Sequence, residues 1–520
     1  MANFSSANAR MDQADGKLSD WILSRTIVSP VEVSSTTRLG RHSLVDFIGR
    51  QRELSTLAAA LAGVQAEIGT ARPGRCLILR GRRRIGKSAL VEEFVDRNRV
   101  PNVFHTSEIG FGADPLTEFT DAVRSSSLPD ADIFAEAIPG NWTAAFRQLA
   151  GILPEAQPSV VVLDELPYLM DPAGAFESVL QRAWDRELSR KPVLLILIGS
   201  DLAMMHALTS YGRPFHQRGT EMRLGPLNPA DVATMTGLEP AAAFDATLIT
   251  GGLPVITARW RAGEDVRAFL TRELADPVSP LVVSAQLSLA AEFPDQTQAR
   301  QVLAAIGSGE RTFTNIARAA GGIAHSTLSR ATELLTDKGI VAAELPISLT
   351  PSKERRYRIT DPYLRFWLTF LGPYLAELDR MRPDLTLERI DRGWTSWRGR
   401  AVEPLVREAL ARVLPMHGIP AVSAIGGYWT RSNDVEIDIV GADREPIAHE
   451  LAFLGSIKWL ENSPFDNHDL TALQRHRHRV TDKPIPLIAV TRSGVTTEHL
   501  DAVFTPADLL EAWQPRDQPA

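Results

Sequence analysis

One stretch decides the fold of this chain: Gly81-Arg82-Arg83-Arg84-Ile85-Gly86-Lys87-Ser88. It matches the pattern G-x-x-x-x-G-K-[ST] of phosphate-binding loops. A short apolar run, residues 76–79, precedes the loop, and residues 89–95 follow it with helical periodicity. The sequence therefore predicts a strand, a glycine-rich loop and a helix in succession. A basic surface turn is the alternative interpretation, and the flanking strand and helix argue against it.

The residue types in this loop suit a triphosphate. The two glycines let backbone N–H groups curl around phosphate oxygens, and the helix that follows presents its positive end. Lys87 would reach the β and γ phosphates, and Ser88 would hold a magnesium ion. We therefore predict ATP and Mg²⁺ as cofactors. The predicted nucleotide-binding residues are Gly81, Arg82, Arg83, Arg84, Ile85, Gly86, Lys87, Ser88 and Ala89.

A second motif, Ser159-Val160-Val161-Val162-Leu163-Asp164-Glu165, is an apolar run that ends in two carboxylates. Parallel sheets bind ligands at the carboxyl ends of their strands, so this strand would bring both acids to the loop. Asp164 would hold magnesium, and Glu165 would polarise the water that attacks the γ phosphate. Taken alone, such a strand is equally well read as ending in a surface turn.

Further catalytic candidates follow the next apolar run, residues 193–198. Ser200 or Asp201 would act as a polar sensor between the carboxylates and the γ phosphate, and either residue would serve equally well as a helix N-cap. Arg213 and Arg218 are candidates for an arginine finger, with Arg218 preferred, and a solvated arginine is the alternative. A finger that acts across a subunit interface would imply a homo-oligomer.

Alternation of short apolar runs with helical patterns predicts an α/β fold with a doubly wound parallel sheet. With 520 residues the chain is long enough for several domains. We predict a disordered tail (1–44), a P-loop ATPase core (45–226), a helical lid (227–295), a winged helix (296–361), a helical linker (362–395) and a C-terminal α/β domain (396–520).

Several quoted motifs together resemble the archaeal-type AAA+/STAND-like P-loop ATPases that carry a winged helix and a C-terminal PD-(D/E)XK nuclease-like domain. Besides the two motifs above, they are Phe47-Ile48-Gly49-Arg50 with Glu53-Leu54, Gly199-Ser200, Gly251-Gly252-Leu253-Pro254 and Tyr357-Arg358-Ile359-Thr360-Asp361-Pro362-Tyr363-Leu364-Arg365-Phe366-Trp367. The resemblance implies a restriction-endonuclease-like fold for the C-terminal domain. It covers nearly everything after Phe47.

The resemblance also implies acidic metal ligands in that domain, where Glu403, Glu436 and Asp438 are the matching residues. Glu436 and Asp438 are two apart, so they share one face of a strand. The next strand should end in E-x-K, but Ser456 stands in place of the acid two residues before Lys458. A degenerate, non-cleaving domain is therefore favoured over an active nuclease.

Residues 326–338 are the predicted recognition helix of the winged helix, with a basic cluster in the wing at Lys353, Arg355, Arg356 and Arg358. Phosphate contact with double-stranded DNA and intramolecular regulation of the ATPase are equally compatible with this pattern. A net charge of −7 excludes a protein that coats nucleic acid along its length.

Composition limits the remaining classes. Cys76 is the single cysteine, so neither an intrachain disulfide nor a multi-cysteine zinc site can form, as expected in the cytoplasm. No apolar run is long enough to span a membrane. Three functions remain: an ATP-driven switch that acts on the winged helix, the C-terminal domain or a protein partner, an ATP-regulated DNA nuclease, and a nucleotide-sensing DNA-binding regulator. The switch is preferred.

Overall fold

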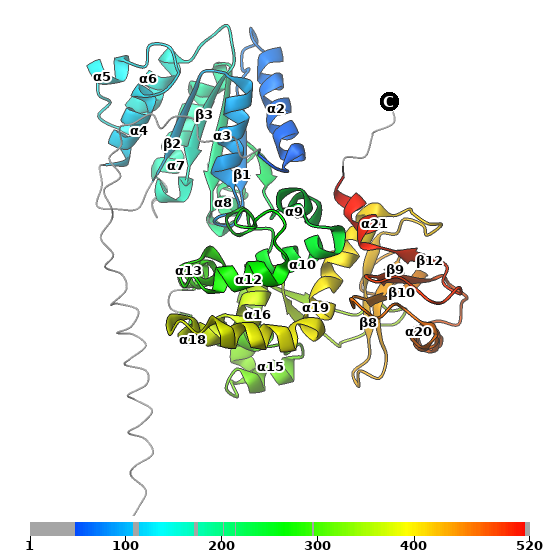
Figure 1. Ribbon diagram of the computed structural model, residues 1–520. Helices are drawn as coiled ribbons and strands as arrows, with labels where there is room; N and C mark the ends of the chain where they lie inside the picture. Colours follow the sequence, from blue (N-terminus) through cyan, green and yellow to red (C-terminus); the bar gives the residue numbers. More distant parts are fainter. Residues whose placement is uncertain are drawn as a thin grey trace, which may run out of the picture. The chain divides into compact units, whose positions relative to one another are not determined.

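The computed structural model describes residues 47–107, 114–170, 175–200, 202–213, 215–293 and 296–514. The tail (residues 1–44) and Asp201 lie outside them, so the predictions made for both stay predictions. The described residues from Ile48 onwards form one compact unit (Figure 1). Among the described residues, no helix is both long enough and apolar enough to cross a lipid bilayer.

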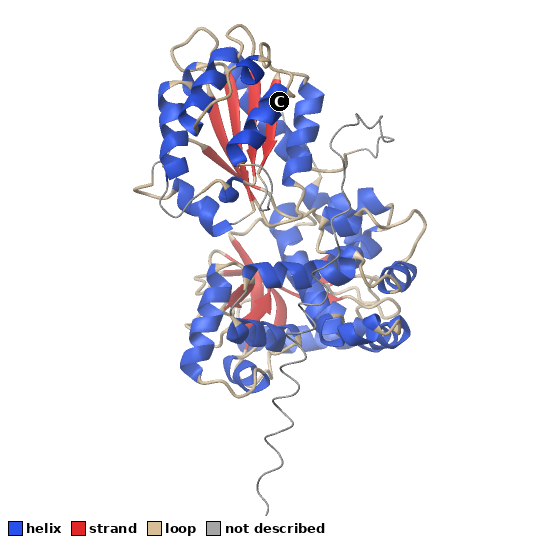
Figure 2. Cartoon of the chain, turned by 90° about the vertical axis from the view of Figure 1, so that its left-hand side faces the viewer, coloured by secondary structure: helices blue, strands red, loops and turns tan. Residues whose placement is uncertain are grey.

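A five-stranded sheet in the order β2-β3-β4-β1-β5 forms the first part of this unit. Its strands are β1 (Arg75–Arg80), β2 (Asn102–Thr106), β3 (Ser159–Asp164), β4 (Val193–Gly199) and β5 (Thr220–Arg223). Every pairing between them is parallel. β3 and β4 are buried throughout, since helices cover both faces of the sheet (Figure 2). This architecture confirms the predicted α/β class.

The helices around this sheet bury the apolar stripes that the sequence pattern indicated. In the first helix, Leu54, Leu57 and Leu61 are buried at helical spacing. The elements are α2 (Gln51–Ala66), α3 (Lys87–Asn98), α4 (Pro115–Arg124), α5 (Ile133–Glu136), α6 (Trp142–Ile152), α7 (Ala175–Arg186) and α8 (Leu202–Thr209), with 3₁₀ turns η1 (Leu166–Tyr168) and η2 (Leu188–Arg190).

In the segment predicted as a helical lid, the described secondary structure consists of helices joined by loops. Its helices are α9 (Pro229–Thr236), α10 (Pro240–Thr250), α11 (Pro254–Thr257), α12 (Val266–Leu274) and α13 (Pro280–Glu292). Gly251 and Gly252 end α10 with φ values of 63° and 64°. A Cβ atom at Gly252 would lie 2.0 Å from the carbonyl oxygen of Leu227, so only glycine fits there.

Three helices and a hairpin follow, as expected for a winged helix. They are α14 (Thr297–Gly307), α15 (Phe313–Ala319), α16 (His325–Asp337), β6 (Val341–Glu344) and β7 (Arg356–Ile359). The two strands pair antiparallel, from Val341 opposite Ile359 to Glu344 opposite Arg356. The predicted helices at residues 313–320 and 326–338 agree with α15 and α16 to within one residue at each end.

The boundary predicted between a helical linker and the C-terminal domain, at residues 395 and 396, falls inside one continuous helix. After α17 (Pro362–Phe370), η3 (Gly372–Tyr374) and α18 (Leu375–Asp379), the 31-residue α19 runs from Pro383 to Val413. The charged residues of its first half are the reason that the sequence predicts a linker there. The helix nevertheless continues through Pro404.

The C-terminal part contains a second five-stranded sheet in the order β12-β11-β10-β9-β8. Its elements are β8 (Ala424–Trp429), β9 (Glu436–Ala442), β10 (Leu451–Lys458), α20 (Asn467–Val480), β11 (Leu487–Thr491), β12 (Ala502–Phe504), α21 (Pro506–Leu510) and η4 (Glu511–Trp513). The apolar pattern of the sequence predicts a strand at 447–454, and β10 begins four residues later. The pattern does not predict β8 or β12. One apolar core joins this sheet to α19 and to Phe244 and Leu248 of α10.

Candidate nucleotide-binding site

The predicted phosphate-binding loop connects the carboxyl end of β1 to α3. Gly86 caps α3 with a φ of 90°, a conformation that favours glycine. The Lys87 ammonium donates hydrogen bonds to the carbonyl oxygens of Gly81 at 3.0 Å and Arg82 at 3.1 Å. The ammonium is thus folded over the loop, where the positive end of a 12-residue helix also lies.

Two further strand ends bring carboxylates and hydroxyls to this loop. Ser88 Oγ donates to Asp164 Oδ2, at the end of β3, at 2.5 Å. Ser200, which follows β4, donates to Glu165 Oε1 at 3.0 Å and Oε2 at 2.7 Å. Because β4 lies between β1 and β3 in the sheet, Ser200 is held beside the acidic strand end. The loop and the predicted acids therefore meet at one edge of the sheet.

The electrostatics of this edge leave both signs of charge under-compensated. Burial raises the pKa of Asp164, and the hydrogen bonds from Ser88 and from the Glu165 backbone only partly oppose that shift. Burial also lowers the pKa of Lys87, although Glu165 and Asp164 attract its charge. A cation beside Asp164 and an anion beside Lys87 would relieve both penalties. Hard oxygen donors such as Ser88 and Asp164 also suit Mg²⁺.

The three arginines of the loop, all among the predicted nucleotide-binding residues, each reach a different element. Arg82 forms an ion pair with Asp361 at 2.9 Å and donates to the carbonyl oxygen of Gly339 at 3.0 Å. Arg83 donates to the Tyr168 hydroxyl at 2.7 Å. Arg84 donates to Ser284 Oγ of α13 at 2.9 Å. The loop is therefore connected directly to the lid and to the segment around α17.

Two other quoted motifs pack against the same loop. Arg50, which is 7% exposed and has a φ of 62°, donates to the Ile85 carbonyl oxygen at 3.2 Å. Pro254 follows the double glycine and lies 3.6 Å from where a Cβ on Gly86 would stand. The turn that follows α10 is thus beside the loop. In the sequence, Arg50 stands out only as part of the motif Phe47 to Arg50. Its contact with the loop could not be read there, because Ile85 lies 35 residues further along the chain.

Both arginine-finger candidates are engaged with α7. Arg218 makes a bidentate ion pair with Asp185, with Nε–Oδ1 and Nη2–Oδ2 distances of 2.9 and 3.0 Å. Arg213 pairs with the buried Glu177 at 2.5 Å. These contacts hold the arginines in this conformation, and the assignment of a finger to Arg218 stays a prediction.

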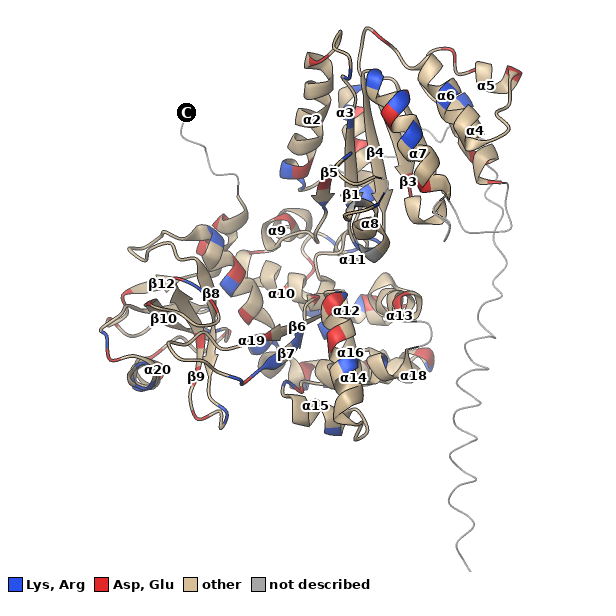
Figure 3. Ribbon diagram, turned by 180° about the vertical axis from the view of Figure 1, so that it is seen from behind, with Lys and Arg blue, Asp and Glu red and all other residues tan. Residues whose placement is uncertain are grey.

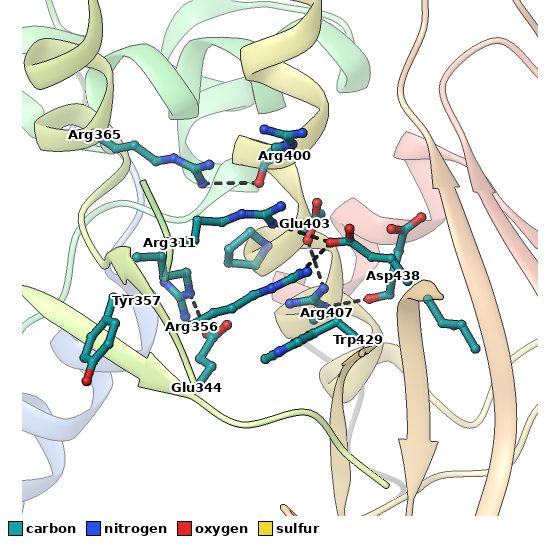
Figure 4. A pocket seen from close by; sticks show the side chains of 14 residues that line it. Arg311, Glu344, Arg356, Tyr357, Arg365, Arg400, Glu403, Arg407, Trp429 and Asp438 are labelled. Atoms are coloured by element: carbon teal, nitrogen blue, oxygen red, sulfur yellow. Dashed lines mark hydrogen bonds and ion pairs between the residues drawn. The ribbon is translucent and has the colours of Figure 1, made fainter. Parts of the chain in front are cut away.

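The predicted nuclease-like acids also come together, but arginines and hydrogen-bond donors neutralise them (Figure 4). Glu436 pairs with Arg356 at 2.6 Å and with Arg311 at 3.4 Å. Glu403 pairs with Arg407 at 2.9 Å. We call Glu403, Glu436 and Asp438 the acid cluster. Burial tends to raise the pKa of Glu436, but the hydrogen bond and charge of Arg356 outweigh it, so the pKa is lowered.

The remaining donors at this cluster come from β10 instead of a metal-binding motif. Asp438 Oδ2 accepts hydrogen bonds from Ser456 Oγ at 2.9 Å and from the Ile457 backbone N–H at 2.8 Å. Lys458 is paired with Asp469 of α20 at 2.8 Å, so its ammonium is engaged outside the acid cluster. The serine that replaces the expected acid thus holds the carboxylate by a hydrogen bond. This geometry favours the degenerate interpretation over cleavage.

The wing arginines predicted to contact DNA are partly used within the chain. Arg356 is buried, stacks over Trp429 at 4.5 Å and donates to Asn433 Oδ1 at 2.6 Å. Arg358 pairs with Glu344 at 2.5 Å. Figure 3 shows Lys and Arg positions in and around β7. Lys353 and Arg355 remain exposed. The wing therefore supports intramolecular packing more directly than contact with DNA.

Comparison with known proteins finds one family. Residues 367–470 match DUF234, described as archaeal and bacterial proteins of unknown function. A Walker-type ATPase of Pyrococcus abyssi is similar in structure, with 19% identity, a TM-score of 0.45, and coverage of 62% of this chain and 96% of that chain. The ORC2 protein of Aeropyrum pernix, solved in ADPNP–ADP complexes, is 14% identical with a TM-score of 0.42, and the match covers 67% of this chain and 97% of that chain. No curated protein matched.

Proposed function

We propose that this chain is an ATP-binding and ATP-hydrolysing molecular switch. One observation carries the proposal: Lys87, Ser88, Asp164 and Glu165 meet at the carboxyl edge of a parallel sheet, on a glycine loop that begins a helix. Backbone N–H groups and one ammonium suit phosphate, and the adjoining hydroxyl and carboxylate suit magnesium. Few other ligands need this combination.

The residues then have distinct roles. The loop amides and Lys87 bind and orient the phosphates, while Ser88 and Asp164 hold the metal, which when bound neutralises charge that develops on the phosphoryl oxygens. Glu165 orients and polarises the attacking water. Ser200 holds the Glu165 carboxylate through hydrogen bonds to both of its oxygens, which fixes the direction in which that carboxylate faces.

Coupling to the rest of the chain follows from Arg82. Its guanidinium belongs to the loop that would surround the phosphates, yet it pairs with Asp361, the N-cap of α17, and with Gly339 after α16. A triphosphate carries more negative charge than the partly buried carboxylate of Asp361, and arginine can bind either group through two parallel hydrogen bonds. Nucleotide binding would therefore compete for Arg82 and loosen its link to α17. Nucleotide state would then reach the winged helix and α19.

The test compares full-length protein with and without Mg²⁺ and ATP, using hydrogen–deuterium exchange over residues 339–365. We expect faster exchange there when a non-hydrolysable ATP analogue is bound, and a reduced difference in Arg82→Ala. The control is Arg97→Ala, which removes an exposed arginine of α3 that pairs with Glu93. An unchanged exchange pattern with saturating nucleotide would rule out coupling through α17, and an absence of phosphate release from ATP would rule out the hydrolytic role.

A further inference from the structure

A cavity lies where β7, α17 and α19 meet the C-terminal sheet (Figure 4). Its lining residues are distant in sequence from the phosphate-binding loop. Its volume is about 40 Å³. One water molecule needs roughly 10–15 Å³ on this measure, so the cavity has room for a small polyatomic ion. We call it the arginine pocket, because its lining includes Arg311, Arg356, Arg358, Arg365, Arg400 and Arg407.

Charge does not balance in the arginine pocket. Six guanidinium groups face four carboxylates, those of Glu344, Glu403, Glu436 and Asp438. Every ion pair among them involves Arg311, Arg356, Arg358 or Arg407. Within the described part of the chain, Arg365 and Arg400 have no ion pair with a carboxylate. With all four carboxylates ionised, two positive charges are left over, both on the α17 and α19 side, and protonation of Glu403, whose pKa burial raises to about 7, adds to this excess.

Arg365 is the less solvated of the two and gains little from the protein. Its Nη1 donates to the carbonyl oxygen of Arg400 at 3.2 Å, and its guanidinium lies 5.9 Å from the centre of the Trp397 ring. Burial lowers the pKa of Arg365 to about 10; attraction from Glu403 opposes this, and repulsion from neighbouring arginines adds to it. The group stays charged at neutral pH. An anion in the cavity would supply the missing counter-charge.

We propose that the arginine pocket binds a phosphate dianion, with Arg365 and Arg400 as its principal ligands. Two charges match the excess, and the planar guanidinium fork suits tetrahedral oxyanions with several acceptor oxygens. The volume admits one phosphate group and excludes a polyphosphate chain. The acid cluster takes no part as a ligand, because its carboxylates already pair with the other arginines or accept hydrogen bonds from β10. The source is either free inorganic phosphate or the 5′-phosphate of a nucleotide.

The experiment titrates full-length protein with sodium phosphate and separately with AMP, by isothermal titration calorimetry in chloride buffer. It is done in the Lys87→Ala background, so that the phosphate-binding loop does not contribute. We expect saturable binding of phosphate, weakened by about tenfold or more in Arg365→Gln and in Arg400→Gln. Arg355→Gln is the matched control, since Arg355 is exposed and lies outside the pocket. Similar affinities would identify free phosphate as the source, and tighter AMP binding would identify a nucleotide.

Arg400 is exposed, so its variant is expected to fold even if Arg365→Gln does not. Thermal unfolding of each variant without phosphate identifies any loss of folding. Binding that is unchanged in Arg400→Gln, or absent in the Lys87→Ala parent, would overturn the proposal. Neither result would affect the proposed ATPase, which is measured separately by phosphate release from ATP in the wild-type chain.

Discussion

Two sheet edges in this molecule gather carboxylates, and they treat them in opposite ways. At the end of β3, Asp164 and Glu165 accept hydrogen bonds from Ser88 and Ser200, and the nearby ammonium of Lys87 donates to backbone carbonyl groups. In the acid cluster, guanidinium groups pair with Glu436 and Glu403. Among the described residues, the acids of the first edge have no ion pair with a basic side chain, whereas arginines pair with two of the three acids of the second. A cluster of acids alone does not define a metal site.

The largest expected effect is on the affinity for ATP, when the lysine near each edge is replaced in turn. Lys87→Ala should lower the affinity for ATP by about a hundredfold or more, because it removes the only ammonium in the loop. Lys458→Ala should leave the affinity unchanged, since that ammonium is paired with Asp469. Equilibrium titration with a fluorescent ATP analogue measures both. Equal affinities in the two variants would contradict the contrast between the edges.

Replacing one carboxylate at each edge should slow ATP hydrolysis at the first edge only. Glu165→Gln should retain ATP binding and slow hydrolysis by on the order of a hundredfold, as expected for loss of a group that polarises water. Glu436→Gln should hydrolyse ATP at the wild-type rate. Steady-state phosphate release at saturating ATP distinguishes them. A normal rate in Glu165→Gln would transfer the catalytic role to another residue.

Stability should change with opposite sign at the two edges. Glu436→Gln should cost about 1–2 kcal/mol of unfolding free energy, because the buried Arg356 loses its partner and the partial exposure of Glu436 moderates the loss. Asp164→Asn should gain up to about 1 kcal/mol, because burial raises the pKa of Asp164 and so disfavours its charge. Urea unfolding without nucleotide measures both. Destabilisation by Asp164→Asn would show that its charge is already compensated.

A further effect is a pH dependence within the acid cluster. Burial raises the pKa of Glu403 from 4.5 to about 7, so the folded chain holds this proton over a range in which the unfolded chain has lost it. The contribution of Glu403 to stability therefore falls as the pH rises from 4.5 to about 7 and is constant above that range. Thermal unfolding midpoints between pH 5 and 8 should decline less steeply in Glu403→Gln. A slope identical to wild type would place this titration elsewhere.

Local signals made the first edge predictable. β1, β3 and β4 are apolar runs that stop at glycine or acid, and the loop has fixed spacing, so their meeting follows from the topology of a parallel sheet. Gly426 and Gly427 weaken the strand pattern of β8, which explains why it was not predicted.

The second edge depends on contacts between distant residues, and these could not be predicted. Arg356 and Glu436 are 80 residues apart, and Arg82 and Asp361 are 279 apart. A basic wing looks the same in sequence whether its partner is a phosphate backbone or a carboxylate of the same chain. The sequence pattern identifies these charged side chains, but tertiary packing determines which partners they contact.

The continuous helix α19 limits how the sequence can vary. It spans about 46 Å from Pro383 to Val413, and each residue along it adds about 100° of rotation. Arg398 on this helix is ion-paired with Asp245 of α10 at 3.0 Å, and Arg407 further along donates to the backbone carbonyl oxygen of Asp438 in β9 at 2.8 Å. One residue inserted near Arg392 would turn everything after it by more than a quarter circle. Related chains that keep these contacts should therefore tolerate substitutions in the first half of α19 but conserve its length.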